Sequence, residues 1–312
     1  MARRRLGLVS LGGMILAVSL AGCSTGSGEE GPTERGFVGA DGIGIEAADP
    51  SRIVTLSGDL TEFVFELGLG PSIVATDVTT VAPEEAVTLP KAGIGRFLTA
   101  EGVLKHDPTL VIGDTQTAPL STIEQIRAAG VPVAILPVPT TFDGLSEKIA
   151  SLGLLLGRES EAAALEERLR DDIEDAVASA PRLDPPPRAA FVYSRGPDVM
   201  LLFGEGMTTK PLIEASGAVD AGAAAGVEGT ITVTPEALAA AAPDVLIVTS
   251  EGLEMLDGID GLLAIPGVAG TPAGANGRVL AYPEGDVLTF GPRIADSIRR
   301  MAEDLDRVFD GS

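Results

Sequence analysis

The sequence predicts an α/β fold in which two similar lobes are joined by a single long helix. The stretch TAEGVLKHDPTLVIGDT at 99–115 returns as TPEALAAAAPDVLIVTS at 234–250. The segments RIVTLS at 52–57 and RAAFVYS at 188–194 have nearly the same offset, so the duplication covers whole lobes. Apolar runs of strand length alternate with helical patterns in both halves, which is typical of parallel βαβ construction.

Each copy of the repeat predicts a short helix, a proline turn and a buried strand. The turns fall at Pro108 and Pro243, and the strands at Leu110–Ile112 and Val245–Val248. Short apolar runs bounded by turn signals fit strands of a covered sheet. Each copy is therefore half of a βαβ unit.

The starts of the two repeat helices share one pattern. Thr99 and Thr234 suit helix N-caps, and Pro235 suits a first helical position. Glu101 and Glu236 place a carboxylate in the first turn, where the helix dipole favours it. Helix electrostatics alone would account for both glutamates.

The remaining elements divide the chain into lobes. The first lobe adds a strand at 52–57, a helix around 60–67, a strand at 72–77, and a helix and a strand within 123–137; the second adds strands at 188–194 and 278–283. Between them, strong helix formers at 146–180 are interrupted near Gly157 and stopped by PRLDPPPR. We predict a first lobe over 51–145, a connecting helix over 146–187 and a second lobe over 188–312. Ligands of such folds bind at the carboxyl ends of the strands, here between the lobes.

The N-terminal segment reads as an export signal. Residues 1–22 hold three arginines and then a glycine-broken apolar stretch that is too short to be trusted as a membrane span. The residues before Cys23 resemble a bacterial lipobox, which predicts lipidation of that cysteine. Residues 23–50 are rich in Gly, Ser and acids and predict a flexible tether.

Composition excludes several classes of function. The chain has 22 Lys and Arg against 45 Asp and Glu, a formal net charge of −23, which makes nucleic acid an improbable partner. It has one Cys and no Trp, so an internal disulfide, a cysteine-based metal site and a tryptophan stacking platform are excluded. The acidic balance suits an exported domain or docking to a basic partner.

An enzyme finds little support in the residue inventory. His106 is the only histidine, and it is predicted at the strand ends away from the crevice, where the second repeat copy has Ala241. Asp77 and Asp114 end strands on the crevice side without an identifiable acid or base partner, so turn caps or hinge contacts are the preferred interpretation. The glycine runs at 93–98 and 204–210 lack phosphate-loop spacing.

Longer motifs identify a family. RIVTLSGDLTEFVFELG and LTAEGVLKHDPTLVIG, together with the lipobox and the duplicated lobes, resemble the substrate-binding lipoproteins of ABC importers for iron chelates, haem and cobalamin. The similarity runs from about Arg52 to Phe309. YSRG at 193–196, GVEG at 226–229, SEGLEMLDGIDGLLAIPGVAGTPAGANGRVLAY at 250–282 and FGPR at 290–293 resemble the hemin-binding branch.

This resemblance implies a class III periplasmic-binding-protein fold and a receptor rather than an enzyme. The protein would be anchored outside the cytoplasm through Cys23, act as a monomer, bind haem between its lobes as a transported ligand, and deliver it to an ABC permease and its ATPase. A ferric siderophore or cobalamin is the alternative ligand. Of these two, cobalamin is slightly disfavoured because the chain has no Trp to pack on the corrin ring. An extracytoplasmic enzyme on a lipid tether is the rival from another class.

The resemblance also implies roles for single residues. Tyr193 is expected to bind the haem iron through its phenolate, and Arg195, two residues on, to lie on the same side and lower the pKa of Tyr193. A half-buried tyrosine at a strand end is the alternative. Glu101 and Glu236 would dock onto arginines of the permease.

Two further arginines are candidates for the haem propionates. Arg96 and Arg293 are both expected near the cleft, although an exposed arginine and a first-turn arginine are equally good interpretations. Some relatives supply a second iron ligand from the first lobe, where this sequence has Val81 and Arg96. We therefore expect a five-coordinate iron or a water on that side.

Overall fold

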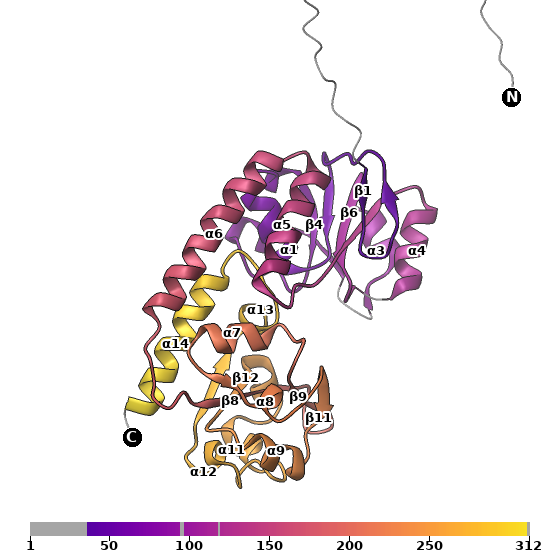
Figure 1. Ribbon diagram of the computed structural model, residues 1–312. Coiled ribbons are helices and arrows are strands. Elements are labelled where there is room, and N and C mark those ends of the chain that lie inside the picture. Colours follow the sequence, from indigo (N-terminus) through magenta and orange to yellow (C-terminus); the bar gives the residue numbers. More distant parts are fainter. Residues whose placement is uncertain (1–35, 94–96, 118, 311–312) are drawn as a thin grey trace, which may run out of the picture. The chain divides into compact units, whose positions relative to one another are not determined.

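The computed structural model describes residues 36–93, 97–117 and 119–310 (Figure 1). The predicted signal at 1–22, Cys23 and Arg96 lie outside the described residues. The described chain contains two α/β lobes, each with its own sheet (Figure 1).

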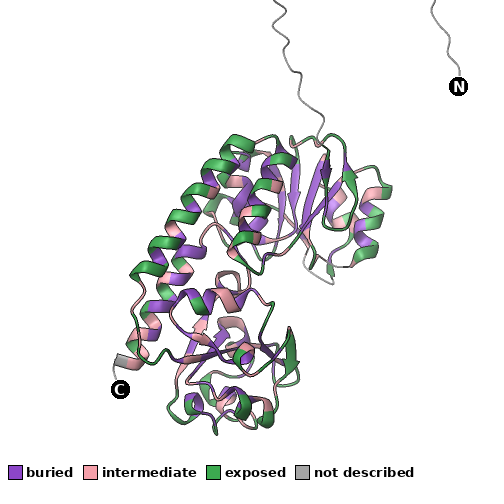
Figure 2. Ribbon diagram, viewed as in Figure 1, coloured by how far each residue is buried: buried purple, intermediate pink, exposed green. Residues whose placement is uncertain are grey.

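The first lobe is built on a five-stranded parallel sheet with the order β5-β4-β3-β6-β7. Its strands are β3 (Ile53–Thr55), β4 (Ile73–Asp77), β5 (Lys91–Gly93), β6 (Leu110–Asp114) and β7 (Val133–Leu136). Its helices are α1 (Gly58–Glu66), η1 (Gly70–Ser72), α2 (Glu84–Val87), α3 (Ala100–Leu104), α4 (Leu120–Ala128) and α5 (Phe142–Leu156). The strands are almost wholly buried, as expected of a parallel sheet covered on both faces (Figure 2).

The second lobe contains the order β11-β9-β8-β12-β13, with β10 paired to β8. Its strands are β8 (Arg188–Ser194), β9 (Met200–Phe203), β10 (Val219–Asp220), β11 (Thr230–Thr232), β12 (Val245–Thr249) and β13 (Val279–Tyr282). Its helices are α7 (Thr209–Ala215), α8 (Ala221–Ala224), α9 (Pro235–Ala241), α10 (Ser250–Glu254), α11 (Ile259–Leu263), α12 (Pro272–Ala275), α13 (Glu284–Val287) and α14 (Ile294–Asp310).

The second sheet is mixed, which corrects the expectation of purely parallel construction. β8 pairs in parallel with β12 but antiparallel with β9. The chain turns between β8 and β9 within residues 195–199, which include Gly196 at φ +83°. A connection of that length permits a hairpin but not the crossover that a parallel neighbour requires.

The lobes are joined by α6 (Glu159–Ser179), a helix of 21 residues and thus about 31 Å long. Gly157, in a left-handed conformation, ends α5 before α6 begins, so the predicted connecting helix over 146–187 is in fact the end of α5, α6 and a loop. α6 packs against α5 and α14 (Figure 1). None of the helices described between residues 36 and 310 combines the length and the apolar character needed to cross a membrane.

The end of the predicted tether is folded, which corrects the boundary at residue 50. β1 (Phe37–Val38) and β2 (Gly44–Ile45) form an antiparallel hairpin whose Phe37 and Ile45 side chains are buried. The hairpin is attached to β7 because the amide of Ala40 donates to the carbonyl oxygen of Ile135 at 2.7 Å. The two buried apolar side chains, this hydrogen bond and the ion pair of Asp41 with Arg127 at 2.7 Å hold the hairpin to the first lobe.

Candidate functional site

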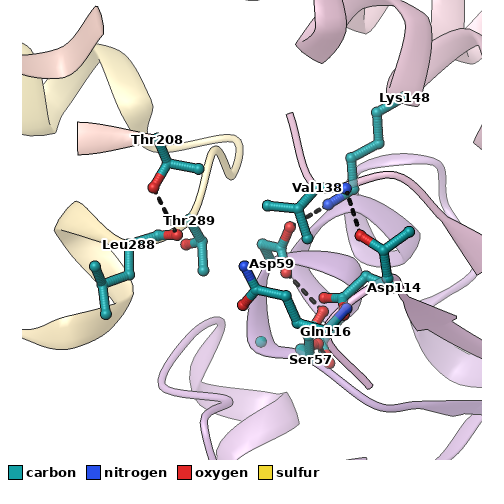
Figure 3. A network of polar contacts seen from close by, with 12 residues as sticks. Ser57, Asp59, Asp114, Gln116, Val138, Lys148, Thr208, Leu288 and Thr289 are labelled. Carbon is teal, nitrogen blue, oxygen red and sulfur yellow. Dashed lines mark hydrogen bonds and ion pairs between the residues drawn. The ribbon is translucent and has the colours of Figure 1, made fainter. Parts of the chain in front are cut away.

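A cleft of about 430 Å³ lies where the strands of the first lobe end and α13 of the second lobe approaches. Residues of both lobes line it, among them Leu56, Asp59, Glu62, Asp77, Val78, Val81, Leu98 and Asp114 from the first and Glu251, Glu284, Leu288 and Arg293 from the second. Figure 3 shows Thr208, Leu288 and Thr289 facing Asp59, Asp114 and Gln116. This is the position that the carboxyl ends of the strands predict for a ligand.

The floor of the cleft contains a buried ion pair that the sequence analysis missed. Asp59, in the first turn of α1, pairs with the Lys148 ammonium of α5 and accepts a hydrogen bond from the Ser57 hydroxyl at 2.6 Å (Figure 3). The Lys148 side chain is only 1% exposed. Burial alone would raise the pKa of Asp59, but the charge and hydrogen bond of Lys148 outweigh it and hold the pKa below its usual value. Asp59 is therefore ionised at neutral pH.

A local signal for Lys148 is present in the sequence. Leu145 and Leu152 precede and follow it by three and four residues, so all three lie on one face of α5. Both leucines are buried. A lysine within an apolar stripe indicates a buried cation that requires a carboxylate partner.

Asp77 and Asp114 end β4 and β6 at the cleft, and both cap their own turns, as predicted. Asp77 accepts hydrogen bonds from the Thr79 hydroxyl at 2.7 and 2.9 Å. Asp114 accepts one from the amide of Gln116 at 2.8 Å. Burial raises the pKa of both carboxyls. Their hydrogen bonds are local, which fits structural roles at the strand ends.

Arg293 connects the lobes. It precedes α14, and its guanidinium donates to both carboxylate oxygens of Glu62 on α1 at 2.9 and 3.0 Å and to Asp286 at 3.1 Å. Arg293 was predicted to be a cation available to propionates, whereas in this structure three carboxylate oxygens hold it. Glu62, whose side chain is 10% exposed, was missed because its partner lies 231 positions away.

Tyr193 and Arg195 lie together at the carboxyl end of β8. The guanidinium of Arg195 is 4.7 Å from the centroid of the half-buried Tyr193 ring, so the prediction that both point to one side is confirmed. The ring also packs against Phe203, with centroids 6.0 Å apart. Both carboxylate oxygens of Glu284 accept hydrogen bonds from Arg195, at 2.6 and 2.7 Å.

The electrostatics of Tyr193 differ from the expectation. Burial and the nearby Glu284 carboxylate raise the pKa of Tyr193, and Arg195 lowers it by less. The expected lowering of the pKa by Arg195 is present, but it is outweighed, so the net change in the pKa of Tyr193 is upward. Burial is the largest cause, and the Glu284 carboxylate, whose contact with Arg195 local spacing could not predict, adds to it.

Comparisons with known proteins identify the family. Residues 53–285 match the model of the family described as periplasmic binding protein. The chain belongs to this family. It is 39% identical to the periplasmic heme-binding protein RhuT from Roseiflexus sp. RS-1, with a TM-score of 0.78, over 83% of this chain and 98% of that one. It is 34% identical to the heme binding protein HmuT, with a TM-score of 0.79, over 86% and 89% of the two chains.

A third relative has another named ligand. The cobalamin-binding protein of Halobacterium salinarum is 28% identical over 269 residues, which are 82% of this chain and 69% of that protein. HmuT has also been solved with alanine in place of a tyrosine, of an arginine two residues after it, and of a histidine. The structural matches confirm the predicted fold of two α/β lobes joined by a helix.

In this periplasmic binding protein the two repeated glutamates occupy equivalent places. Glu101 and Glu236 are exposed in the first turns of α3 and α9. The hydroxyl oxygens of Thr99 and Thr234 accept hydrogen bonds from backbone amides at 3.0 and 3.1 Å, which confirms both N-caps. One carboxylate is thus displayed on each lobe.

A second hollow of about 510 Å³ lies beside α1, α6 and the start of α14. Its charged residues are largely paired with one another: Arg168 with Glu66 at 2.6 Å and Arg299 with Asp296 at 2.9 Å. It lacks the position at the strand ends that favours the cleft as the ligand site. Within the described ranges, no group of three or more His, Cys, Asp and Glu side chains is arranged to hold a metal ion.

Proposed function

We propose that this periplasmic binding protein captures ferric haem in the cleft and delivers it to the permease and ATPase of an ABC importer. The pairing of Tyr193 with Arg195 is the observation that carries the proposal, because a phenolate is an established axial ligand of haem iron. The tyrosine and arginine replaced in HmuT have the same spacing in the chain. Haem is the cargo, and the protein performs no chemistry on it beyond ligation.

Tyr193 and Arg195, which border the cleft through the contact of Arg195 with Glu284, would divide the work of binding with the residues that line it. The phenol of Tyr193 gives up its proton and binds the iron, and the positive charge of Arg195 above the ring stabilises the phenolate. Val78, Val81 and Leu288 give the cleft an apolar wall against which the macrocycle can pack. Arg293 can meet a propionate by exchanging a carboxylate partner, and Arg96 is the other candidate.

The first lobe is not expected to supply a second iron ligand. Its sequence after the signal has no Tyr or Met, and His106 follows α3 at the strand ends opposite the cleft, where Arg52 donates to its carbonyl oxygen. Val81, 58% exposed, offers only apolar contact. The iron would then be five-coordinate or carry a water on that side.

The same proposal covers the location and the partners of the protein. Lipidation of Cys23 would hold a monomer at the outer face of the cell membrane. Glu101 and Glu236, one on each lobe, would dock onto arginines of the permease. The YvrC protein of Bacillus subtilis, named as an ABC transporter substrate-binding lipoprotein, is 23% identical over 94% of both chains and supports this setting.

An absorption titration with ferric haem tests the proposal. The wild type should show a phenolate-to-iron charge-transfer band, and Tyr193→Phe should lose it and bind roughly tenfold more weakly or worse, about 1.4 kcal/mol. Tyr282→Phe is the matched control, because Tyr282 is the only other tyrosine and its hydroxyl donates to Asp304 at 3.0 Å. A wild type without the band, or an unchanged Tyr193→Phe, refutes the haem assignment.

Cobalamin or a ferric siderophore is the second candidate. The cobalamin-binding relative supports it, and so does the charge of the cleft, which contains Glu62, Asp77, Asp114, Glu251 and Glu284. Carboxylates in that number repel the propionates of haem unless those groups point to solvent. Binding of cyanocobalamin or a ferric siderophore, with no response to haem, would replace the first candidate by the second.

A further inference from the structure

A short segment of the second lobe, Leu288–Arg293, extends to the first lobe beside the cleft. It connects α13 to α14, and we call it the strap. The hydroxyl of Thr208 donates to the carbonyl oxygen of Leu288 at 3.3 Å (Figure 3). The hydroxyl of Thr289 donates to the carbonyl oxygen of Gly285 at 2.8 Å. The start of the strap is therefore fixed to the second lobe.

Two contacts of different kinds join the strap to the first lobe. Phe290 is 1% exposed, and its ring stacks on that of Phe142 of α5, with centroids 5.5 Å apart and planes 9° apart. At the end of the strap, Arg293 donates to both carboxylate oxygens of Glu62 on α1, at 2.9 and 3.0 Å. The Glu62 side chain is 10% exposed, so this charge-assisted pair is shielded from solvent more than a surface pair is.

Open space lies on both sides of the Glu62–Arg293 pair. Both residues line the cleft of about 430 Å³ and also the hollow of about 510 Å³ beside α6. Relative motion is the default for two lobes unless a large apolar interface joins them. Next to the cleft, the spacing of the lobes therefore depends on a thin strap and its contacts through Phe290 and Arg293.

We propose that the strap holds the lobes at a fixed spacing, and that Glu62 is a positioning residue which, through Arg293, sets how slowly the ligand leaves the cleft. This rests on the proposed function. A flat ligand between two lobes leaves when the lobes part, so a contact across the lobes adds to the barrier for dissociation. The competing interpretation is that Glu62 only competes with a ligand carboxylate for Arg293. The two interpretations predict opposite effects when the Glu62 charge is removed.

Transfer of haem from the loaded protein to an excess of apomyoglobin measures the dissociation rate. Glu62→Gln keeps the size of the side chain and removes its charge, and we expect haem to leave about three- to tenfold faster, in the range of a partly exposed charged contact between two surfaces. Phe290→Leu weakens the apolar contact and should also speed dissociation. Glu66→Gln is the matched control and should match the wild type, because Glu66 lies on the same helix but pairs with Arg168 of α6.

Amide hydrogen exchange tests the strap without any ligand. The amide of Ile294 donates to the carbonyl oxygen of Gly291 at 3.2 Å, and the amide of Asp296 to that of Arg293 at 3.0 Å. Both amides should exchange several-fold faster in Glu62→Gln than in the wild type or Glu66→Gln, because the end of the strap is released. Exchange in the buried strand β12 should stay unchanged, which separates local release from a general loss of stability.

The outcomes separate the proposal from the proposed function. Haem dissociation that is unchanged in Glu62→Gln overturns the proposal, and slower dissociation does so by assigning Glu62 to competition for Arg293. Unchanged exchange of the two amides also overturns it. A wild type that binds no haem refutes the proposed function and with it the role in ligand release, whereas faster local exchange in Glu62→Gln would still support the strap as the contact that holds the lobes.

Discussion

Replacement of Lys148 by methionine is the most direct test of the buried ion pair at the cleft floor. Lys148 and Asp59 have side-chain exposures of 1% and 5%, and the Lys148 ammonium also lies 5.6 Å from the centroid of the Phe63 ring. Methionine fills a similar volume, so the packing of α5 against α1 is largely kept. The perturbation is thus the loss of a charge beside a buried carboxylate.

The size of the effect follows from burial. Removal of one partner of a buried pair leaves an uncompensated charge and costs about 3–5 kcal/mol. For a chain of this size each kcal/mol lowers Tm by about 2–4 °C, so the expected decrease is roughly 6–20 °C at pH 7. The double variant with Asp59→Asn removes both charges and should recover most of this loss.

The pH dependence has a defined sign. In the wild type Lys148 lowers the pKa of Asp59, so the pair adds stability above the unfolded pKa of an aspartate and loses it as pH falls through the folded pKa. In Lys148→Met the hydrogen bonds from Ser57 and the Leu60 backbone remain, but burial, the largest influence on Asp59, is no longer opposed by the Lys148 charge, so the pKa of Asp59 rises relative to the wild type and protonation at low pH relieves the variant. The difference between the two proteins should therefore shrink as pH falls from 7 toward 4.

Thermal unfolding followed by circular dichroism at pH 7 and pH 5 measures both effects. Lys105→Met is the control, because Lys105 is exposed after α3. A Tm of Lys148→Met equal to that of Lys105→Met at pH 7 would contradict the buried pair. So would a difference that grows as the pH is lowered.

Four further outcomes are expected. Glu101→Ala with Glu236→Ala should abolish haem uptake by cells and leave haem binding intact, and unimpaired uptake would contradict docking. Cys23→Ser should release the protein from the membrane or leave its signal uncleaved. Lipidation would be refuted if mass spectrometry of the wild type finds residues 1–22 still attached and unmodified. Arg293→Gln should lower the free energy of unfolding by about 1–3 kcal/mol, because Glu62 loses its partner. A loss of haem affinity at constant Tm would instead assign Arg293 to a propionate. Asp114→Asn should raise Tm slightly at pH 7, because burial raises the pKa of Asp114 and penalises its ionised form; this advantage should vanish at low pH, where the wild-type carboxyl is protonated.

Features that depend on nearest neighbours in the chain could be predicted from the sequence. The N-caps at Thr99 and Thr234 and the strands β6 and β12 depend on residue types within a few positions. The common side of Tyr193 and Arg195 follows from the alternation of an extended strand. The apolar run at β8 did not predict that β9 pairs with it in antiparallel orientation. Two short apolar runs separated by five residues are compatible with several ways of pairing strands.

The limit of sequence reasoning is clearest at the tether. Composition over 23–50 predicts a flexible segment, yet Phe37 and Ile45 are buried in the core of the first lobe. Each apolar side chain gains burial only because β7 and α5 offer a surface to the hairpin. The average composition of a short sequence window contains no information about that surface, which is formed by residues far along the chain.

By itself, the sequence determined the duplication, the two α/β lobes, the helix between them and the strand-end position of Tyr193. Only the tertiary structure decided which charges meet. Lys148 pairs with Asp59, and Arg195 with Glu284, although the partners are 89 positions apart in the chain in both cases. Arg293 pairs with Glu62, which is 231 positions away. Secondary structure is set by local patterns of residue type, whereas an ion pair is set by where packing brings two elements together. In a chain with 45 acidic residues, the sequence offers each cation many partners and the fold selects one.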